Sequence, residues 1–320
     1  MKKIIFTVDV EGHVGNDPVS ALIWGKDSKN EQYGIDLLMN MLDEFKIKGL
    51  FFVDVAEAWH YGSETIMEVM RHIHERGHLV GVHIHPDHMA DKKRLFLGEY
   101  SYDEQFDIIK KCTNFYVETL GVMPKYFRSG KYSGNWDTLK ILTELGYSID
   151  FSEFYGQKWC KISPECTISN SVRLDSGMLE IPVTTYMSIK NKHYSRFDKI
   201  DATMTFSEFK YIFNNLLKHE SYNVLVLFAH SFSMINWRKN PNNPSFSKKK
   251  YKQLYKQLDY VCNKLNLAFN DLENEALDGF ATEGNGTYFC SKGIRTWYYL
   301  FIRFCSVVKS KIDIRFRKLK

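Results

Sequence analysis

Two carboxylates stand two residues apart where the first apolar segment of the sequence ends. Asp9 lies in the run KIIFTVDV at 3–10, and Glu11 follows directly after it. Alternate side chains of an extended strand point to the same side, so both carboxylates can face one side of a sheet. One of them could then bind a metal ion while the other accepts a proton. An isolated D-x-E pair is more often a solvated strand end, so this interpretation needs support from other residues.

Three histidines within six positions, His83, His85 and His88, end another apolar run at 78–85. Neutral imidazoles beside a carboxylate are common ligands of a catalytic Zn²⁺ ion. A lone histidine would more often be a packed core residue, whereas three at one strand end favour a site for a divalent metal ion, with zinc as the expected ion. Pro86 breaks the strand, which leaves open whether His88 turns back into the site.

Arg128, Asp150 and His230 each lie at the carboxyl end of a further predicted strand. In parallel α/β folds that edge of the sheet collects the working residues. For Arg128 the alternative is a surface ion pair of small energetic value, and for His230 it is a buried histidine at a strand end. The common location of these residues favours one shared site.

Apolar strands and amphipathic helices alternate along the first 275 residues, which predicts βα units and a parallel sheet. The predicted strands cover 3–10, 50–55, 78–85, 125–128, 147–151, 178–183 and 222–230, and the predicted helices cover 35–45, 66–73, 102–120, 134–145, 205–219 and 247–265. We therefore expect an α/β fold, built as an irregular or incomplete (β/α) barrel of about seven parallel strands. Residues 1–275 should form one domain.

The residues in this order resemble the polysaccharide deacetylases of the NodB-homology group, carbohydrate esterase family four, and in particular its divergent bacterial surface-glycan members. TVDVEGH at 7–13 looks like the first motif of the family, and GVHIHPDH at 81–88 looks like its histidine-rich second motif. FRSGKYSGN at 127–135 is similar to its arginine motif, and FAHSFS at 228–233 to its fifth motif. The resemblance covers roughly residues 3–235 and implies the NodB-like barrel.

The sequence departs from the usual family pattern at three points. Val10 separates the two acids, which are most often adjacent, and no two histidines of the second motif stand four residues apart. Ser129 and Gly130 also occupy a loop in which many relatives carry proline. The pattern therefore leaves open which two imidazoles bind the metal.

The resemblance implies a metal-dependent hydrolase that removes an N-acetyl group from a sugar in glycan or surface-polysaccharide biosynthesis. Glu11, His83 and His85, with His88 as an alternative ligand, would hold a divalent metal ion, expected to be Zn²⁺. Asp9 would act as the base and Arg128 would keep it ionised. His230 would protonate the departing amine, and Asp150 is the candidate to keep that imidazole charged.

Two other functions stay open at this point. An allantoinase-like relative would use the same fold and ligands to hydrolyse another C–N (amide) bond in a small molecule. A glycan-binding protein without turnover would explain the altered second motif. Aromatic residues in or near predicted loops suit a saccharide better than a small amide: Trp24, Trp59, Tyr100, Tyr132, Tyr155 and Trp237.

The charge is unevenly distributed along the chain. Residues 290–320 carry nine Lys or Arg and one acid, a net charge of +8, so the other 289 residues are near −3 within the total of +5. A weakly acidic body argues against a nucleic-acid groove. The start of the chain reaches acidic residues before any apolar signal segment develops, so we expect a cytoplasmic protein.

The C-terminal residues 276–320 form a basic, aromatic tail. TWYYLFIRFCSVV at 296–308 is too short to span a bilayer, which needs about 20 apolar residues. Its aromatic rings and the basic residues after it suit the surface of an anionic membrane. A final helix packed on the barrel is the alternative. The first interpretation predicts a peripheral protein on the inner membrane face, acting on an N-acetylated saccharide that could be lipid-linked.

Overall fold

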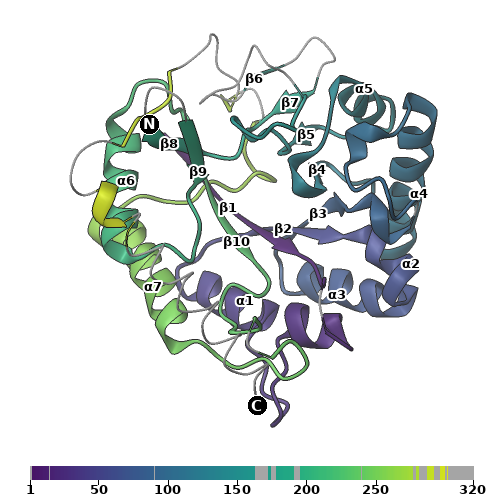
Figure 1. Cartoon of the computed structure of the whole chain (residues 1–320), viewed down its shortest axis with the longest axis horizontal. Helices are drawn as coiled ribbons and strands as arrows, with labels where there is room; N and C mark the ends of the chain where they lie inside the picture. Colours follow the sequence, from purple (N-terminus) through teal and green to yellow (C-terminus); the bar gives the residue numbers. More distant parts are fainter. Residues whose placement is uncertain are drawn as a thin grey trace.

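The structure is a computed structural model of the whole chain. It describes residues 2–13, 15–89, 91–162, 172–173, 178–190, 195–238, 240–276, 279–280, 287–291, 296–299 and 301. A curved central sheet is surrounded on its outside by helices (Figure 1).

Seven parallel strands form most of this sheet, in the order β10-β1-β2-β3-β4-β5-β7, and β6 adds an antiparallel edge beside β7. The strands are β1 (Lys3–Val10), β2 (Leu50–Asp54), β3 (Leu79–Ile84), β4 (Tyr126–Ser129), β5 (Ile149–Asp150), β6 (Val172–Arg173), β7 (Leu179–Glu180) and β10 (Val224–His230). The curl of this sheet and its parallel order confirm the predicted incomplete (β/α) barrel.

Helices connect successive strands and cover the outer face. They are α1 (Ile35–Glu44), α2 (Ala58–Tyr61), α3 (Ser63–Glu75), α4 (Tyr102–Leu120), α5 (Trp136–Glu144), α6 (Phe206–Lys218) and α7 (Lys248–Asp259). Short 3-10 turns lie at η2 (Val55–Glu57), η3 (Pro86–His88), η4 (Leu97–Glu99) and η5 (Gly130–Tyr132), and π turns at η1 (Val19–Trp24) and η6 (Tyr260–Lys264). Helix α4 shows why the predicted limits hold: Ser101 caps its first turn together with Glu104, and Gly121 ends it in the left-handed conformation.

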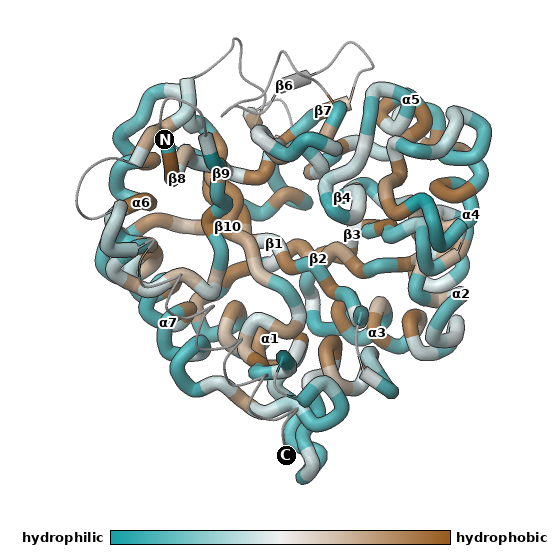
Figure 2. The backbone as a smooth tube through the Cα atoms, in the orientation of Figure 1, coloured by the Kyte–Doolittle hydropathy of each residue, from teal (hydrophilic) through white to brown (hydrophobic). Residues whose placement is uncertain are grey.

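The two faces of the sheet bury different clusters, and Figure 2 shows the hydrophobic colour concentrated along the strands. Alternate residues of β1 such as Ile4 and Phe6 pack outward under the helices, in the larger core. Ile5 points inward, with Phe52 and Val226 of neighbouring strands, and fills the interior of the barrel. This alternation continues to the strand ends and decides which polar residues face the barrel mouth.

A hairpin between β7 and α6 was not predicted. It consists of β8 (Thr185–Lys190) and β9 (Ser195–Lys199), which pair with each other outside the main sheet. The predicted helix at 247–265 is also divided, since α7 passes into the π turn η6 after Asp259. The hairpin matters for function because β9 carries Lys199 to the mouth of the barrel.

Only a few residues of the C-terminal tail are described. Residues 289–291 run beside β8, where the Met187 amide donates to the Phe289 carbonyl and the Ser291 amide donates to the Met187 carbonyl, both at 2.9 Å. The basic residues of the tail lie outside the described residues. Within the described part of the chain, none of the helices has both the length and the apolar composition needed to cross a bilayer. The domain boundary near residue 275 stays a prediction.

Candidate functional site

Four predicted site residues lie together on the inner face of neighbouring strands. Asp9 of β1 is in register with His230 of β10, and His83 of β3 is in register with Arg128 of β4. Along each strand these residues occupy the same alternate positions as the apolar residues that fill the barrel interior, so their side chains also point inward. The carboxyl ends of the strands therefore bring side chains from distant parts of the sequence into one site, as predicted.

Asp9 and Arg128 form a buried ion pair. The Arg128 Nη1 donates to Asp9 Oδ1 at 2.5 Å, and the exposed fractions of the two residues are only 0% and 4%. Arg128 also donates to the Phe151 carbonyl and the Thr7 hydroxyl at 3.2 Å, and its guanidinium lies 4.2 Å from the centre of the Phe52 ring. Burial by itself raises the pKa of Asp9, but the positive charge of Arg128 and the nearby imidazoles outweigh it, so the pKa is lowered.

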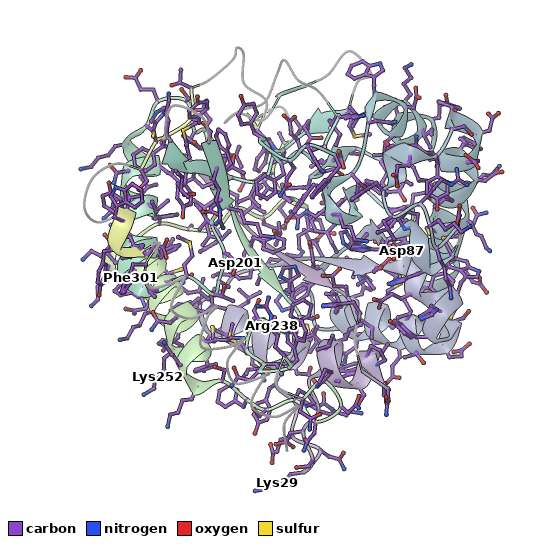
Figure 3. All side chains as sticks on the ribbon, in the orientation of Figure 1. Lys29, Asp87, Asp201, Arg238, Lys252 and Phe301 are labelled. Carbon is purple, nitrogen blue, oxygen red and sulfur yellow. The ribbon has the colours of Figure 1, made fainter. Side chains whose placement is uncertain are left out.

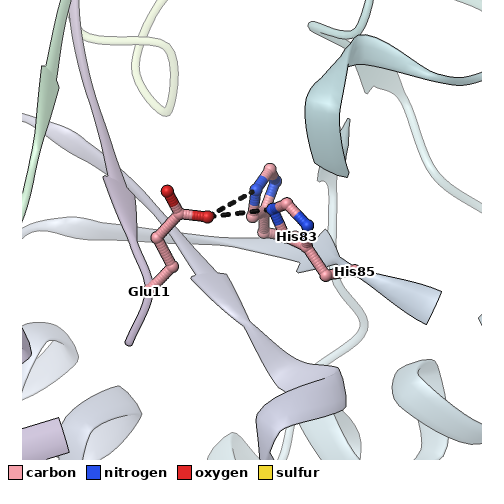
Figure 4. A group of neighbouring side chains, drawn as sticks. All are labelled: Glu11, His83 and His85. Atoms are coloured by element: carbon pink, nitrogen blue, oxygen red, sulfur yellow. Dashed lines mark ion pairs between the residues drawn. The ribbon is translucent and has the colours of Figure 1, made fainter. Parts of the chain in front are cut away.

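Glu11, His83 and His85 form a second group directly beside this pair (Figure 4). Glu11 Oε2 lies 2.9 Å from His85 Nε2 and 3.8 Å from His83 Nε2. Burial raises the pKa of Glu11, but hydrogen bonding to His85 and the surrounding imidazoles lower it well below its usual range. One oxygen and two ring nitrogens, all within 4.8 Å of one another, fit the ligand set of a divalent cation.

The tautomer of His83 is fixed by its other ring nitrogen. His83 Nδ1 lies 2.8 Å from the Arg128 carbonyl oxygen, which can only accept, so Nδ1 carries the hydrogen. The lone pair is then on Nε2, which faces Glu11. A hydrogen bond from the second ring nitrogen to a carbonyl is the usual way in which metal-binding histidines are oriented. The Arg128 residue therefore holds both the base candidate, by its side chain, and a ligand candidate, by its backbone.

His230 approaches the same carboxylate from the side of β10. Its Nε2 lies 3.6 Å from Glu11 Oε1, and its ring stacks on Phe232 with 4.7 Å between the ring centres. Burial lowers the pKa of His230 and Lys199 lowers it further, against the opposite influence of Glu11 and Asp9. His230 thus lies across the cluster from the other two imidazoles, with 26% of its side chain accessible to solvent.

Lys199 and Tyr132 complete this side of the site, and the role of Lys199 was not predicted. The Lys199 Nζ donates to the Tyr132 hydroxyl at 2.8 Å and lies 3.2 Å from the centre of the Phe228 ring. Burial lowers the pKa of Lys199 to about 8. Tyr132 has a left-handed φ of 56°, and so does its neighbour Lys131, at 53°. No motif marks Lys199 in the sequence, and no strand was predicted over the hairpin that carries it.

Two predicted site residues lie elsewhere. His88 does not join Glu11; its Nδ1 lies 3.1 Å from Asp54 Oδ2, in a separate group that also includes Glu57. Asp150 is not brought to His230 in the described structure. It accepts a hydrogen bond from Ser152 at 2.6 Å and adjoins Glu180. The reason is that β5 lies beside β7, toward the end of the sheet away from β10, and that the neighbours of Asp150, Ile149 and Phe151, are the residues that face the barrel interior.

The aromatic residues predicted for a saccharide cleft are divided between two places. Trp237 packs edge-on against Phe232 and His13, which links it to the His230 side of the site. Tyr132 also borders the site, through Lys199. The remaining four make contacts elsewhere: Trp24 with His72, Trp59 with Phe115, Tyr100 with Arg94, and Tyr155 with Phe197. His13, two residues after Glu11, is a further neighbour that sequence analysis missed.

Comparison with known proteins gives a family match and a common fold. Residues 30–149, which include His83, His85 and Arg128, match the sequence profile of the polysaccharide deacetylase family. No curated protein sequence matches the chain. The matched segment begins after Asp9 and Glu11 and ends before His230.

Among solved structures, a candidate polysaccharide deacetylase from Mycobacterium smegmatis is similar with a TM-score of 0.52 and 19% identity, over 86% of this chain and 94% of that chain. A polysaccharide deacetylase from Bacillus cereus gives a TM-score of 0.45 and 14% identity, over 86% and 95% of the two chains. A family 4 carbohydrate esterase from Streptomyces lividans, in complex with acetate, gives 0.43 and 11%, over 85% and 93%. The family match over residues 30–149 and the fold shared with the first of these agree with the resemblance read from the sequence.

Proposed function

We propose that this chain is a divalent-metal-dependent hydrolase that removes an N-acetyl group from a sugar of a glycan. The family match supports carbohydrate deacetylation as the reaction class. The observation that carries the proposal is the buried Asp9–Arg128 pair beside the donors of Glu11, His83 and His85. A packed core would not need an ionised carboxylate, a guanidinium and three further polar donors in one place.

Asp9 is proposed as the general base. Its lowered pKa keeps it ionised at neutral pH, so it can accept a proton from water. Arg128 fixes the carboxylate through one oxygen, which leaves the other oxygen of Asp9 to face the reacting atoms. Because Arg128 is itself held by the Phe151 carbonyl and Thr7, the base is oriented before substrate binds.

Glu11, His83 and His85 are proposed to hold the metal ion. When bound, a divalent ion supplies Lewis acidity toward the acyl carbonyl and lowers the pKa of water. Glu11 contributes negative charge, and the two imidazoles contribute neutral nitrogen donors of the type that Zn²⁺ accepts. The His83 ring is oriented for this role by the Arg128 carbonyl.

His230 is proposed to deliver a proton to the departing nitrogen. An amine is a poor leaving group, so amide hydrolysis needs a proton donor near the departing nitrogen. Across Glu11 from His85, His230 is partly open to solvent and can exchange its proton. Its lowered pKa makes the protonated ring a stronger acid than an exposed histidine. Lys199 is the other cation near this position.

The substrate is proposed to be an N-acetylated saccharide of a surface glycan, carried on a lipid at the inner membrane face. Tyr132 and Trp237 border the site, and aromatic rings of this kind stack on sugar faces. Trp297, Tyr298 and Phe301 have exposed fractions of 69%, 58% and 64%, while Tyr299 is buried near Tyr211 of α6 (Figure 3 labels Phe301). This exposed aromatic group, followed by basic sequence, supports contact with anionic lipid.

The function is tested by acetate release from N-acetylated oligosaccharides, free and lipid-linked, with the metal-loaded full-length chain. Release that stops on chelation and returns with added Zn²⁺ would support the proposal. A protein that binds the oligosaccharide but releases no acetate would contradict it and favour glycan binding alone. Membrane contact is tested separately: the chain without residues 293–320 should lose salt-sensitive binding to anionic liposomes and keep its activity on a soluble substrate.

A further inference from the structure

A second group of donors lies beside the candidate metal site. Asp54 ends β2, Glu57 belongs to the 3-10 turn η2 that follows, and His88 ends the 3-10 turn η3 after β3. Asp54 and Glu57 have an exposed fraction of 0%. His88 Nδ1 lies 3.1 Å from Asp54 Oδ2 and 4.0 Å from Glu57 Oε1. One donor atom from each residue lies within 4.8 Å of the other two.

One oxygen of each carboxylate holds the backbone of the neighbouring site. Asp54 Oδ1 accepts from the His85 amide at 3.1 Å and from the Ala56 amide at 3.2 Å. Glu57 Oε1 accepts from the Gly12 amide at 2.6 Å. The two carboxylates therefore fix the segments that carry Glu11 and His85.

The remaining donor atoms of this group are buried and make no hydrogen bond among the described residues. They are Asp54 Oδ2, Glu57 Oε2 and His88 Nδ1. Asp54 Oδ2 and His88 Nδ1 are close enough for a hydrogen bond but are not aligned for one. Leaving buried polar atoms without partners destabilises a fold, and more so when the atoms are charged. Buried donor atoms without partners, in three residues that each bring one donor within 4.8 Å of the other two, form an arrangement that a cation satisfies.

We propose that Asp54, Glu57 and His88 bind a second divalent transition-metal cation, separate from the one assigned to Glu11, His83 and His85. Two carboxylates and one imidazole form a donor set suited to Zn²⁺ or Mn²⁺. A cation here neutralises the two buried carboxylates and, through their other oxygens, stiffens the backbone at Gly12 and His85. The role of this second site is therefore structural: it holds the backbone segments that carry Glu11 and His85.

The immediate surroundings agree with a closed structural site. The His60 ring stacks on His88 with 5.6 Å between the ring centres. The Tyr61 ring meets His88 edge-on at 5.9 Å, and its hydroxyl donates to the Gly12 carbonyl at 2.7 Å. Only 15% of the His88 side chain is accessible to solvent. A proton on Glu57 is the competing way to relieve the repulsion between the carboxylates, and stoichiometry distinguishes the two.

The test is the metal content of the full-length chain after loading with Zn²⁺ alone and removal of excess ion. The native chain should retain two equivalents, and His88→Ala and His83→Ala should each retain one. Glu57→Gln keeps the acceptor for the Gly12 amide but removes the charge, so it should also retain one. His74→Ala, which removes an exposed histidine of α3, is the matched control and should retain two.

Each outcome of this test bears on one site. If the native chain retains one equivalent of Zn²⁺ and only His83→Ala loses it, the second site is overturned and the proposed function is left intact. If the native chain retains one equivalent of Zn²⁺ and only His88→Ala loses it, the result supports the second site and contradicts the metal assignment in the proposed function. Added Zn²⁺ should also raise the melting temperature of His83→Ala but not that of the His83→Ala/His88→Ala double variant; equal shifts in both would overturn the second site.

Discussion

Arg128 donates to Asp9 at 2.5 Å across the barrel interior, and the same residue accepts from the His83 ring through its carbonyl oxygen at 2.8 Å. One arginine thus aligns the proposed base and a proposed metal ligand. The arrangement couples the stability of the fold to the charge state of the site, because both partners of the pair are buried.

Replacement of Arg128 by methionine should destabilise the protein strongly, since the Asp9 carboxylate would remain buried without its partner. The expected loss is about 3–5 kcal/mol in the free energy of unfolding, measured by urea denaturation. Arg94→Met breaks the exposed pair with Glu104 and should cost less than about 1 kcal/mol. Equal losses for the two variants would contradict the buried pair. The Asp9→Asn/Arg128→Met double variant should lose less than the sum of the single variants.

His230→Gln should slow amide substrates far more than activated esters. A nitrogen leaving group needs protonation, whereas an aryl ester expels a stable phenolate, so the loss on the N-acetylated substrate should be roughly 10²–10⁴-fold. Steady-state rates on an N-acetyl sugar and on an aryl acetate make the comparison. His219→Gln, near the end of α6, serves as the control histidine and should be active on both. Equal losses on both substrates for His230→Gln would instead indicate a structural role.

Lys199 should determine the alkaline limit of activity. Its pKa of about 8 means that the folded protein loses this positive charge as the pH rises through 8, while an unfolded chain keeps it to about 10.5. The rate should therefore fall above pH 8, and Lys199→Met should lose that limb of the kcat/KM profile. Between about pH 8 and 10.5 the unfolded state binds more protons, so stability should rise with pH in the native chain and not in the variant. Identical pH profiles of kcat/KM for the native chain and Lys199→Met would show that Lys199 does not set the alkaline limit.

Glu153 should make the fold less stable at alkaline pH. Burial, and then Asp150, raises its pKa to about 8, so the folded state holds a proton that the unfolded state releases near 4.5. The folded pKa is raised, which means that this stabilisation is complete below about 4.5 and is lost as the pH rises through 8. The free energy of unfolding should differ less between about pH 5 and about pH 9 in Glu153→Gln than in the native chain. Chemical denaturation at both pH values measures the difference, and an unchanged pH dependence would contradict it.

Much of the fold follows from the sequence because its signals are local. Apolar runs such as that in β1 and amphipathic segments such as α4, with its Ser101 cap and Gly121 end, need no knowledge of distant contacts. The hairpin of β8 and β9 was missed because β9 (SRFDK) is polar and at most half-buried, so it lacks the apolar pattern of a buried strand.

The site was predictable as far as strand ends could be recognised. Asp9, His83, Arg128 and His230 meet because parallel strands share one carboxyl edge. The partners of His88 depend on how the chain turns after Pro86, and those of Asp150 on the adjacent strand β7, and neither is visible in local sequence. Lys199 comes from the hairpin, so its place beside Tyr132 required the tertiary structure.

The most direct test of the account is Asp9→Asn, assayed for acetate release and for metal content on the same preparation. The amide keeps the size of the side chain but cannot accept a proton from water, while Glu11, His83 and His85 are unchanged. The account predicts that acetate release falls by at least about 10²-fold while the metal content stays at the native level. Acetate release near the native rate would contradict the role of Asp9 and, with it, the proposed reaction.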